Sequence, residues 1–351
     1  MIMETAIIFK IAVLALASFL LAFFTTPILT HFLYKYKLGK QIRDAKDAPV
    51  FASFHQNKSG TPTMGGIMIW LVTLFIALLF SLLGYLFPET ILAKLDFLTR
   101  EQTLLPMGIM VLAAVIGLVD DYFGIKKIGP KGGGLSVLYR LGLYTLVATI
   151  AAIWFYFKLD WDVFHVPFVG NFELGLWYLP IFIFIVVATA FSVNETDGLD
   201  GLAGGVLISI FCALGAIAFT QGKYDLTTFC AVIIGALLAF LWFNINPARF
   251  FMGDTGAMGL GITVGIIAMI TNTALLMPII GFILVLETVS VIIQVLSKKI
   301  RGKKVFLSAP IHHHFQAKNW TEPKIVMRFW LISGVSSVVG IIVFLLDKGW
   351  Y

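Results

Sequence analysis

The chain has 351 residues, of which 59% are hydrophobic and 13% charged. With a mean hydropathy of +0.95, this composition excludes a soluble globular protein and indicates a polytopic membrane protein. The formal net charge of +6 is concentrated in a few loops, where it indicates membrane orientation rather than binding of nucleic acid. The two cysteines, Cys212 and Cys230, lie in apolar runs, which disfavours both a disulfide and a cysteine-ligated metal.

Ten apolar stretches follow one another along the chain, and most approach the roughly 20 residues that a helix needs to cross a bilayer. Because the alternating pattern of a membrane β-barrel is absent, the sequence predicts an all-α protein with a single transmembrane domain over residues 1–351. The eighth stretch is short and rich in glycine, so we expect it to lie inside the bundle. The stretches are Ile11–Leu29, Ile67–Leu86, Leu104–Val119, Leu141–Phe157, Leu179–Phe191, Gly201–Phe219, Phe229–Phe243, Leu260–Ile270, Leu275–Val295 and Phe329–Leu346.

Lysine and arginine are concentrated in three loops, at residues 35–58, 126–131 and 298–304. The positive-inside rule places these loops in the cytoplasm, and ten spans then put both termini outside. The unusual polar motifs all fall on the same cytoplasmic side. A site at one membrane face suits chemistry between a soluble substrate and a lipid headgroup, whereas a transporter more often has its polar residues near the bilayer midplane.

Two adjacent carboxylates, Asp120 and Asp121, end the third apolar stretch. Ionised carboxylates are costly at the end of a membrane helix, and neighbouring ones repel each other. A divalent cation or a metal-bound phosphate would stabilise such a pair. The alternative is an ordinary solvated helix end.

Two further carboxylates, Asp197 and Asp200, lie in the glycine-rich segment Asn194–Gly205. They would share one face if this segment begins the next helix, and glycine allows a ligand to approach the backbone closely. The alternative is a capped turn, because Thr-Asp-Gly is common in turns.

Asp254 follows Gly253 at a predicted helix start, where a carboxylate is a plausible ligand for Mg²⁺. The preceding Phe250 and Phe251 offer flat faces on which a base can stack. The alternative is an N-cap aspartate beside interfacial aromatic side chains.

Three contiguous histidines, His312–His314, lie in the last basic loop. Neighbours in sequence rarely point to one metal, so we favour hydrogen bonding to phosphate or acid–base work over zinc binding. Gly60–Gly66, just after Lys58, has hydroxyls and amides that can meet an anion, although it lacks the ending of a P-loop.

Together these motifs resemble the phospho-N-acetylmuramoyl-pentapeptide transferase family, a branch of the polyprenyl-phosphate N-acetylhexosamine-1-phosphate transferases. The acidic pair, Thr196–Gly201 and Phe251–Asp254 resemble the superfamily, while Gly60–Gly66 and Ala309–Phe315 resemble this branch. The resemblance implies a multi-pass enzyme of the bacterial cytoplasmic (inner) membrane. It implies Mg²⁺-dependent transfer of phospho-MurNAc-pentapeptide from UDP-MurNAc-pentapeptide to undecaprenyl phosphate in the lipid bilayer, which releases UMP.

The resemblance also implies roles for individual residues. Asp120, Asp121, Asp254 and His312 match catalytic positions, and Asp254 matches the magnesium ligand. Positions that bind the nucleotide and phosphates, with Phe251 stacking on uracil, are matched by Lys58, Thr63, Asn194, Asp197, Gly198, Asp200, Asn244, Phe251 and His313.

The chain departs from the family pattern at two positions. Gly124 stands where the family usually has a lysine, so we expect Lys126, Lys127 or Lys131 to reach the same phosphate. Phe191 stands where many members have an asparagine.

The alternatives are a polyprenyl-phosphate GlcNAc-1-phosphate transferase, which the three histidines disfavour, and a secondary transporter. The sequence leaves open a covalent intermediate, although direct attack is favoured. It allows a homodimer without specifying the oligomeric state.

Overall fold

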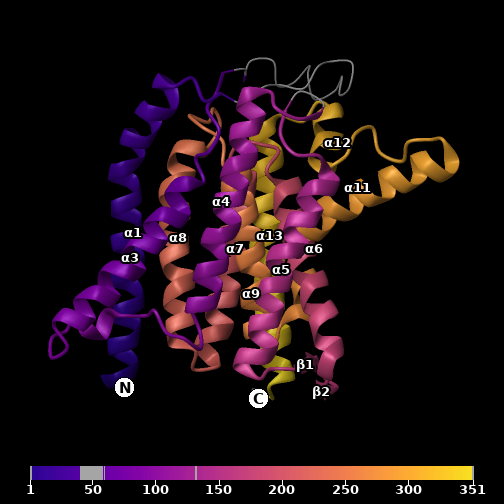
Figure 1. Ribbon diagram of the computed structural model, residues 1–351. Coiled ribbons are helices and arrows are strands. Elements are labelled where there is room, and N and C mark those ends of the chain that lie inside the picture. Colours follow the sequence, from indigo (N-terminus) through magenta and orange to yellow (C-terminus); the bar gives the residue numbers. More distant parts are fainter. Residues whose placement is uncertain (1, 40–57, 59, 131–132, 350–351) are drawn as a thin grey trace.

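The computed structural model describes residues 2–39, 58, 60–130 and 133–349 as a bundle of long helices (Figure 1). Both termini lie at the same end of the bundle, and α12 lies at the opposite end. In the described part of the chain, nine helices are long and apolar enough to cross a membrane, and a bent pair makes a tenth. The long helices are α1 (Ile2–Lys35), α3 (Ile67–Leu86), α4 (Leu104–Lys126), α5 (Val137–Leu159), α6 (Tyr178–Thr196), α7 (Leu202–Thr220), α8 (Tyr224–Asn244), α9 (Gly253–Ile270), α11 (Phe282–Arg301) and α13 (Glu322–Asp347).

The predicted all-α membrane fold is confirmed, and each of the ten apolar stretches lies in a helical region. The shorter elements connect the long helices at the two ends of the bundle. They are η2 (Ala93–Leu95), β1 (Val163–Val166), β2 (Gly170–Glu173), η4 (Gly175–Trp177), η5 (Ala274–Leu276), α10 (Met277–Ile280) and α12 (Ile311–Ala317). The two strands pair as an antiparallel hairpin near the C-terminus of the chain (Figure 1).

Helix α9 lies in the middle of the bundle, as its glycines led us to expect, and 94% of it is buried. Small residues let neighbouring helices approach its backbone. A Cβ on Gly117 of α4 would lie 2.3 Å from the carbonyl oxygen of Asp254, and one on Gly261 would lie 2.8 Å from the Cα of Ala190 in α6. These close contacts bring the ends of α4, α6 and α9 together.

The ninth apolar stretch is not one straight span. It breaks at Gly281, and α10 and α11 meet at an angle of 88°, so that α11 projects away from the bundle (Figure 1). Its buried side chains are partly polar, and one of them, Gln294, accepts hydrogen bonds from the backbone of Val305 and Phe306, both at 3.0 Å. Most apolar side chains after Leu284, among them Val289 and Leu296, are exposed instead, as expected for a helix in contact with lipid.

Candidate active site

Asp121 stabilises the start of α9 from the neighbouring helix α4. Its carboxylate oxygens accept the backbone N–H groups of Asp254 at 3.1 Å and Thr255 at 3.0 Å, and the hydroxyl of Thr63 at 3.3 Å. The first N–H groups of a helix have no partner within the helix and favour a negative charge. Asp121, which is buried, therefore acts as the cap of α9.

The alternative interpretation of Asp254 as the N-cap of α9 is wrong, because the N-cap position of α9 makes no side-chain capping hydrogen bond. The side chain of Asp254 points elsewhere and leaves the cap to Asp121. One of its oxygens accepts a hydrogen bond from the amide of Asn194, and the Nη1 of Arg140 lies 3.6 Å away.

Asp120 and Asp254 share a cation that the sequence motifs did not reveal, Arg140 near the start of α5. The Nε of Arg140 lies 2.9 Å from Oδ2 of Asp120, and its Nη1 donates to Oδ1 of Asn194 at 3.2 Å. The other oxygen of Asp120 accepts the backbone N–H of Leu135 at 2.5 Å. We call Asp120, Asp121, Asp254, Asn194 and Arg140 the carboxylate cluster.

The ion pair between Arg140 and Asp120 does not have the geometry of a hydrogen bond. Oδ2 of Asp120 is buried, and no donor among the described residues satisfies it. The charge of this oxygen is therefore balanced by the guanidinium of Arg140, 2.9 Å away, and the oxygen can bind another cation if Arg140 moves to a phosphate.

Backbone hydrogen bonds join the glycine-rich segment after Lys58 to the segment just before α9. The amides of Gly65 and Gly66 donate to the carbonyls of Phe251 and Met252, both at 2.8 Å. The amide of Phe251 donates to the carbonyl of Pro62 at 2.8 Å. The expectation that the amides of this segment meet an anion is therefore wrong for Gly65 and Gly66, whose donors are already used.

Lys58 lies between two carboxylates from distant parts of the chain. Its Nζ lies 2.6 Å from Oδ1 of Asp200 and 2.6 Å from Oε1 of Glu322 at the start of α13. The amine also lies 5.9 Å above the ring of Phe251, which places a cation beside a flat aromatic face. The second oxygen of Asp200 accepts the amide of Asn246 at 3.0 Å and the backbone N–H of Ala248 at 3.1 Å.

The segment with Asp197 and Asp200 is a turn and does not begin a helix. Because α6 ends at Thr196 and α7 begins at Leu202, the two carboxylates share no helix face. Asn244 holds this turn to the segment before α9. Its side chain accepts the backbone N–H of Gly201 at 2.9 Å and donates to the carbonyl of Phe250 at 2.7 Å.

His312 is fully buried and paired with Glu287 of α11, another residue that the motifs did not reveal. Nδ1 of His312 lies 2.9 Å from Oε2 of Glu287. Burial, and then the charge of Lys58, lower the pKa of His312 to about 3, so the ring is neutral near pH 7. Its Nε2 has no partner among the described residues and points at Gly198, where an added Cβ would lie 2.3 Å away.

The three neighbouring histidines do not all face the same way, as expected for a short helical turn. Nδ1 of His313 lies 2.7 Å from the side-chain oxygen of Gln316, whereas Nδ1 of His314 accepts the backbone N–H of Leu307 at 3.1 Å. His312 and His313 are buried, and their ring centres are 4.1 Å apart. His314 thus belongs to the surface of the loop and not to the buried pair.

The four remaining candidate residues lie in different surroundings. Phe250 is fully buried against Phe240 and Phe243, so it offers no free face, and the expectation that it stacks on a base is wrong. Phe251 is only partly buried. Lys126 is exposed at the end of α4, with its amine 5.8 Å from the ring of Tyr122. Lys131, like Lys40, Arg43 and Lys46 in the first basic loop, lies outside the described residues.

Comparison with known proteins identifies the class of this membrane fold and polar site. A family model described as Glycosyl transferase family 4 matches residues 103–272, which include every member of the carboxylate cluster. A second model, Phospho-N-acetylmuramoyl-pentapeptide-transferase signature 1, matches residues 58–69. The chain is therefore a membrane-embedded phospho-sugar transferase.

Curated relatives define the family more closely. The chain is 38% identical to the phospho-N-acetylmuramoyl-pentapeptide-transferase of Chloroflexus aggregans over 93% of this chain and 88% of the relative. It is 36% identical to the enzyme of the same name from Bacillus subtilis over 97% of this chain and 98% of the relative. The chain belongs to the phospho-N-acetylmuramoyl-pentapeptide-transferase family, which confirms the resemblance seen in its motifs.

Proposed function

We propose that the carboxylate cluster catalyses Mg²⁺-dependent transfer of phospho-MurNAc-pentapeptide from UDP-MurNAc-pentapeptide to undecaprenyl phosphate. The products are the first lipid intermediate of peptidoglycan synthesis and UMP. The observation that carries this proposal is Arg140, held between Asp120 and Asp254 at one end of a membrane bundle. Such an arrangement suits a reaction between phosphate groups, whose negative charge must be neutralised before they can approach each other.

Asp254 and Asp120 are the residues that would hold Mg²⁺. Their oxygens are hard ligands of the type that Mg²⁺ prefers, and Oδ2 of Asp120 has no hydrogen-bond donor among the described residues. In the described part of the chain, His, Cys, Asp and Glu side chains form no group of three suited to a metal, so phosphate oxygens and water would complete the coordination. The bound ion would neutralise charge on the pyrophosphate.

The remaining residues position the substrates. Arg140 and Lys58 would exchange their carboxylate partners for phosphate oxygens, and Phe251 would stack on uracil. An oxygen of undecaprenyl phosphate attacks the phosphorus attached to the sugar, the pyrophosphate P–O bond breaks, and UMP leaves with the electron pair. Neutral His312 can donate or accept one hydrogen bond through Nε2 beside Gly198, and His313 would add a second contact.

The test is UMP release by the purified enzyme with undecaprenyl phosphate and either UDP-MurNAc-pentapeptide or UDP-GlcNAc. The proposal expects UMP only with the pentapeptide substrate and only with Mg²⁺. Release with UDP-GlcNAc alone would favour the GlcNAc-1-phosphate transferase, and no release with either donor would favour the transporter.

We also propose that the carboxylate cluster faces the cytoplasm and that both termini lie outside the bacterial cytoplasmic membrane. Lys127 at the end of α4 and Lys94 in η2 are exposed at opposite ends of the bundle. In a background without Cys212 and Cys230, Lys94→Cys should react with an impermeant thiol reagent in intact spheroplasts. Lys127→Cys should react only after lysis, and the reverse pattern would contradict the orientation.

A further inference from the structure

A cavity of about 560 Å³ opens at the end of the bundle that carries the termini, far from the carboxylate cluster. Its walls come from the β1–β2 hairpin, the turn between α7 and α8, the end of α9 and the end of α13. Its lining includes Trp161, His165, Gln221, Lys223, Phe344 and Lys348. The family's chemistry, as proposed above, uses none of them.

Lys223 brings a partly buried amine to this cavity. Its Nζ donates to the carbonyl of Ile270 at 2.5 Å and lies 5.6 Å from the ring of Trp161. Burial, and then the charge of Lys348, lower the pKa of Lys223 to about 8. Two ammonium groups therefore face the same space, and neither is ion-paired among the residues that the structure describes.

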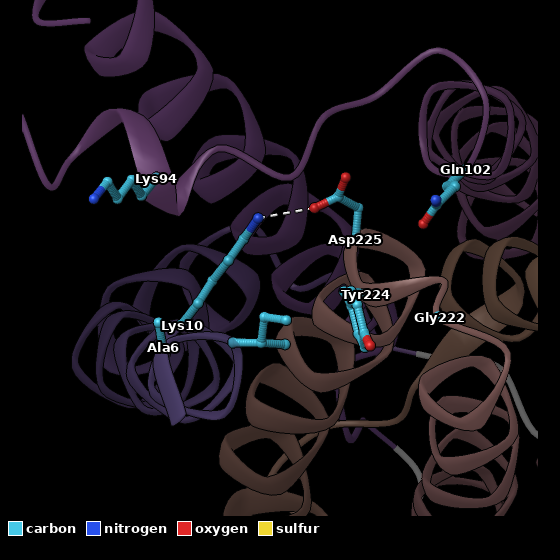
Figure 2. Close-up of a pocket in the computed structure, with 8 residues that line it drawn as sticks. Ala6, Lys10, Lys94, Gln102, Gly222, Tyr224 and Asp225 are labelled. Carbon is cyan, nitrogen blue, oxygen red and sulfur yellow. Dashed lines mark hydrogen bonds and ion pairs between the residues drawn. The ribbon is translucent and has the colours of Figure 1, made fainter. Parts of the chain in front are cut away.

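A neighbouring cavity at the same end of the bundle contains a lysine amine that is paired with an anion. In this space of about 310 Å³, Nζ of Lys10 lies 2.8 Å from Oδ1 of Asp225 (Figure 2). The same amine also donates to the carbonyl of Asp96. Removing an ammonium group from water is costly unless an anion accompanies it. Lys10 has that anion, whereas partly buried Lys223 has no carboxylate within ion-pair distance among the described residues.

Asp347 interacts electrostatically with the adjacent Lys348, but its oxygens are already hydrogen-bonded to other groups. Asp347 lies 2.6 Å from Nε2 of His165 and accepts the backbone N–H of Phe168 at 2.6 Å. Gln221 adds an unused acceptor, because its Nε2 donates to the carbonyl of Thr271 while its buried Oε1 has no donor in the described part of the chain. The cavity thus offers two cations for an anion and one acceptor for a hydroxyl.

We propose that this cavity binds the glycerophosphate headgroup of an anionic phospholipid. The phosphate lies between the amines of Lys223 and Lys348, and a glycerol hydroxyl donates to Oε1 of Gln221. The rings of Trp161 and Phe344 cover the carbon atoms of the headgroup. The cavity lies at the ends of membrane-spanning helices, where headgroups are found and where aromatic and basic side chains contact them. Soluble glycerol 3-phosphate carries the same chemical groups.

Native mass spectrometry of the detergent-purified protein tests this site. Dioleoyl-phosphatidylglycerol, dioleoyl-phosphatidylcholine and glycerol 3-phosphate are titrated separately into the unaltered protein, Lys223→Gln, Lys348→Gln and the control Lys94→Gln. Lys94 is an exposed lysine at the same end of the bundle, and Lys348 is exposed as well, so its replacement leaves the packing intact.

We expect phosphatidylglycerol, but not phosphatidylcholine, to bind the unaltered protein and Lys94→Gln. The apparent affinity should fall at least about tenfold in Lys223→Gln and Lys348→Gln, as loss of a charge-assisted hydrogen bond implies. Equal binding of phosphatidylglycerol to Lys348→Gln and Lys94→Gln would overturn the site. If glycerol 3-phosphate binds in a lysine-dependent way and no lipid binds, the proposal that the ligand is a phospholipid is overturned.

Discussion

The two ends of the helix bundle hold buried charge of opposite sign and differ in how that charge is neutralised. At one end, Asp121 is saturated by two backbone N–H groups and a hydroxyl, while neighbouring Asp120 keeps one oxygen without a donor in the described part of the chain. At the other end, Lys10 is paired with Asp225, while Lys223 faces a cavity whose described lining holds no counter-ion for it. In each pair the saturated member stabilises the fold, and the unsaturated member is available to a ligand. The following substitutions test this distinction.

After Asp254, the largest effect on catalysis is expected at Asp120. Asp120→Asn keeps the size of the side chain but removes the charge that faces Arg140 and the proposed metal. We expect turnover to fall by about 100-fold or more, as for loss of a group that stabilises charge in the transition state. UMP release measured over a range of Mg²⁺ concentrations should show reduced chemistry with metal binding partly retained. Turnover within a few-fold of the unaltered enzyme would remove Asp120 from the catalytic group.

The largest effect on stability is expected at Asp121. Asp121→Ala leaves the N–H groups of Asp254 and Thr255 buried without an acceptor, at a cost of about 1–3 kcal/mol for each group. The melting temperature of the detergent-solubilised protein should therefore drop clearly, whereas Asp120→Asn should change it little. Glu101→Ala, at an exposed position, serves as the control. If Asp121→Ala melts like Glu101→Ala, Asp121 is not the cap of α9.

An effect on catalysis of similar size separates His312 from His314. His312→Ala removes the buried ring beside Gly198 and should abolish most activity, by about 100-fold if this ring hydrogen-bonds the reacting phosphates. His314→Ala removes only a contact to the backbone of Leu307 and should be mild. Initial rates at matched protein levels measure the difference. An equal loss at both positions would show that the loop as a whole, and not His312, is required.

The effect that is smallest near neutral pH is a dependence of stability on pH. Because the pKa of His312 is lowered to about 3, this ring stays unprotonated in the native protein until the pH approaches 3. A histidine in the unfolded chain has its ordinary pKa of about 6.5 and binds a proton below that pH. The free energy of unfolding should thus fall as the pH drops from about 6.5 towards 3. Melting curves should show a weaker pH dependence for His312→Gln than for His31→Gln, an exposed control. Identical pH profiles would contradict the neutral, buried state of His312.

Most of the fold could be predicted from the sequence because apolar length decides a membrane helix. The second apolar stretch has the bounds of α3, Ile67–Leu86, without any adjustment. The bend at Gly281 could not be predicted, since a single glycine in an apolar run does not specify an angle. The polar face of α11, where Gln294 holds the loop that follows the helix, gives no signal of this bend either.

The candidate site was only partly predictable. The motifs indicated Asp120, Asp121 and Asp254, but their different partners arise from contacts between helices that are distant in sequence. Arg140 carries no local signal, because its partners lie on α4, α6 and α9. Glu287 did carry a local sequence signal. An isolated carboxylate inside an apolar stretch indicates a buried polar partner, and here that partner is His312.

The measurement that tests the central claim most directly is Mg²⁺-dependent UMP release by Asp254→Asn. Asp254 does not cap α9, so the substitution should leave the melting temperature unchanged while it removes a charge that Mg²⁺ requires. We predict that turnover falls by orders of magnitude and that higher Mg²⁺ concentrations restore it only in part. Near-normal UMP release at ordinary Mg²⁺ concentrations, from a protein that melts like the unaltered enzyme, would contradict the assignment of the metal to Asp254.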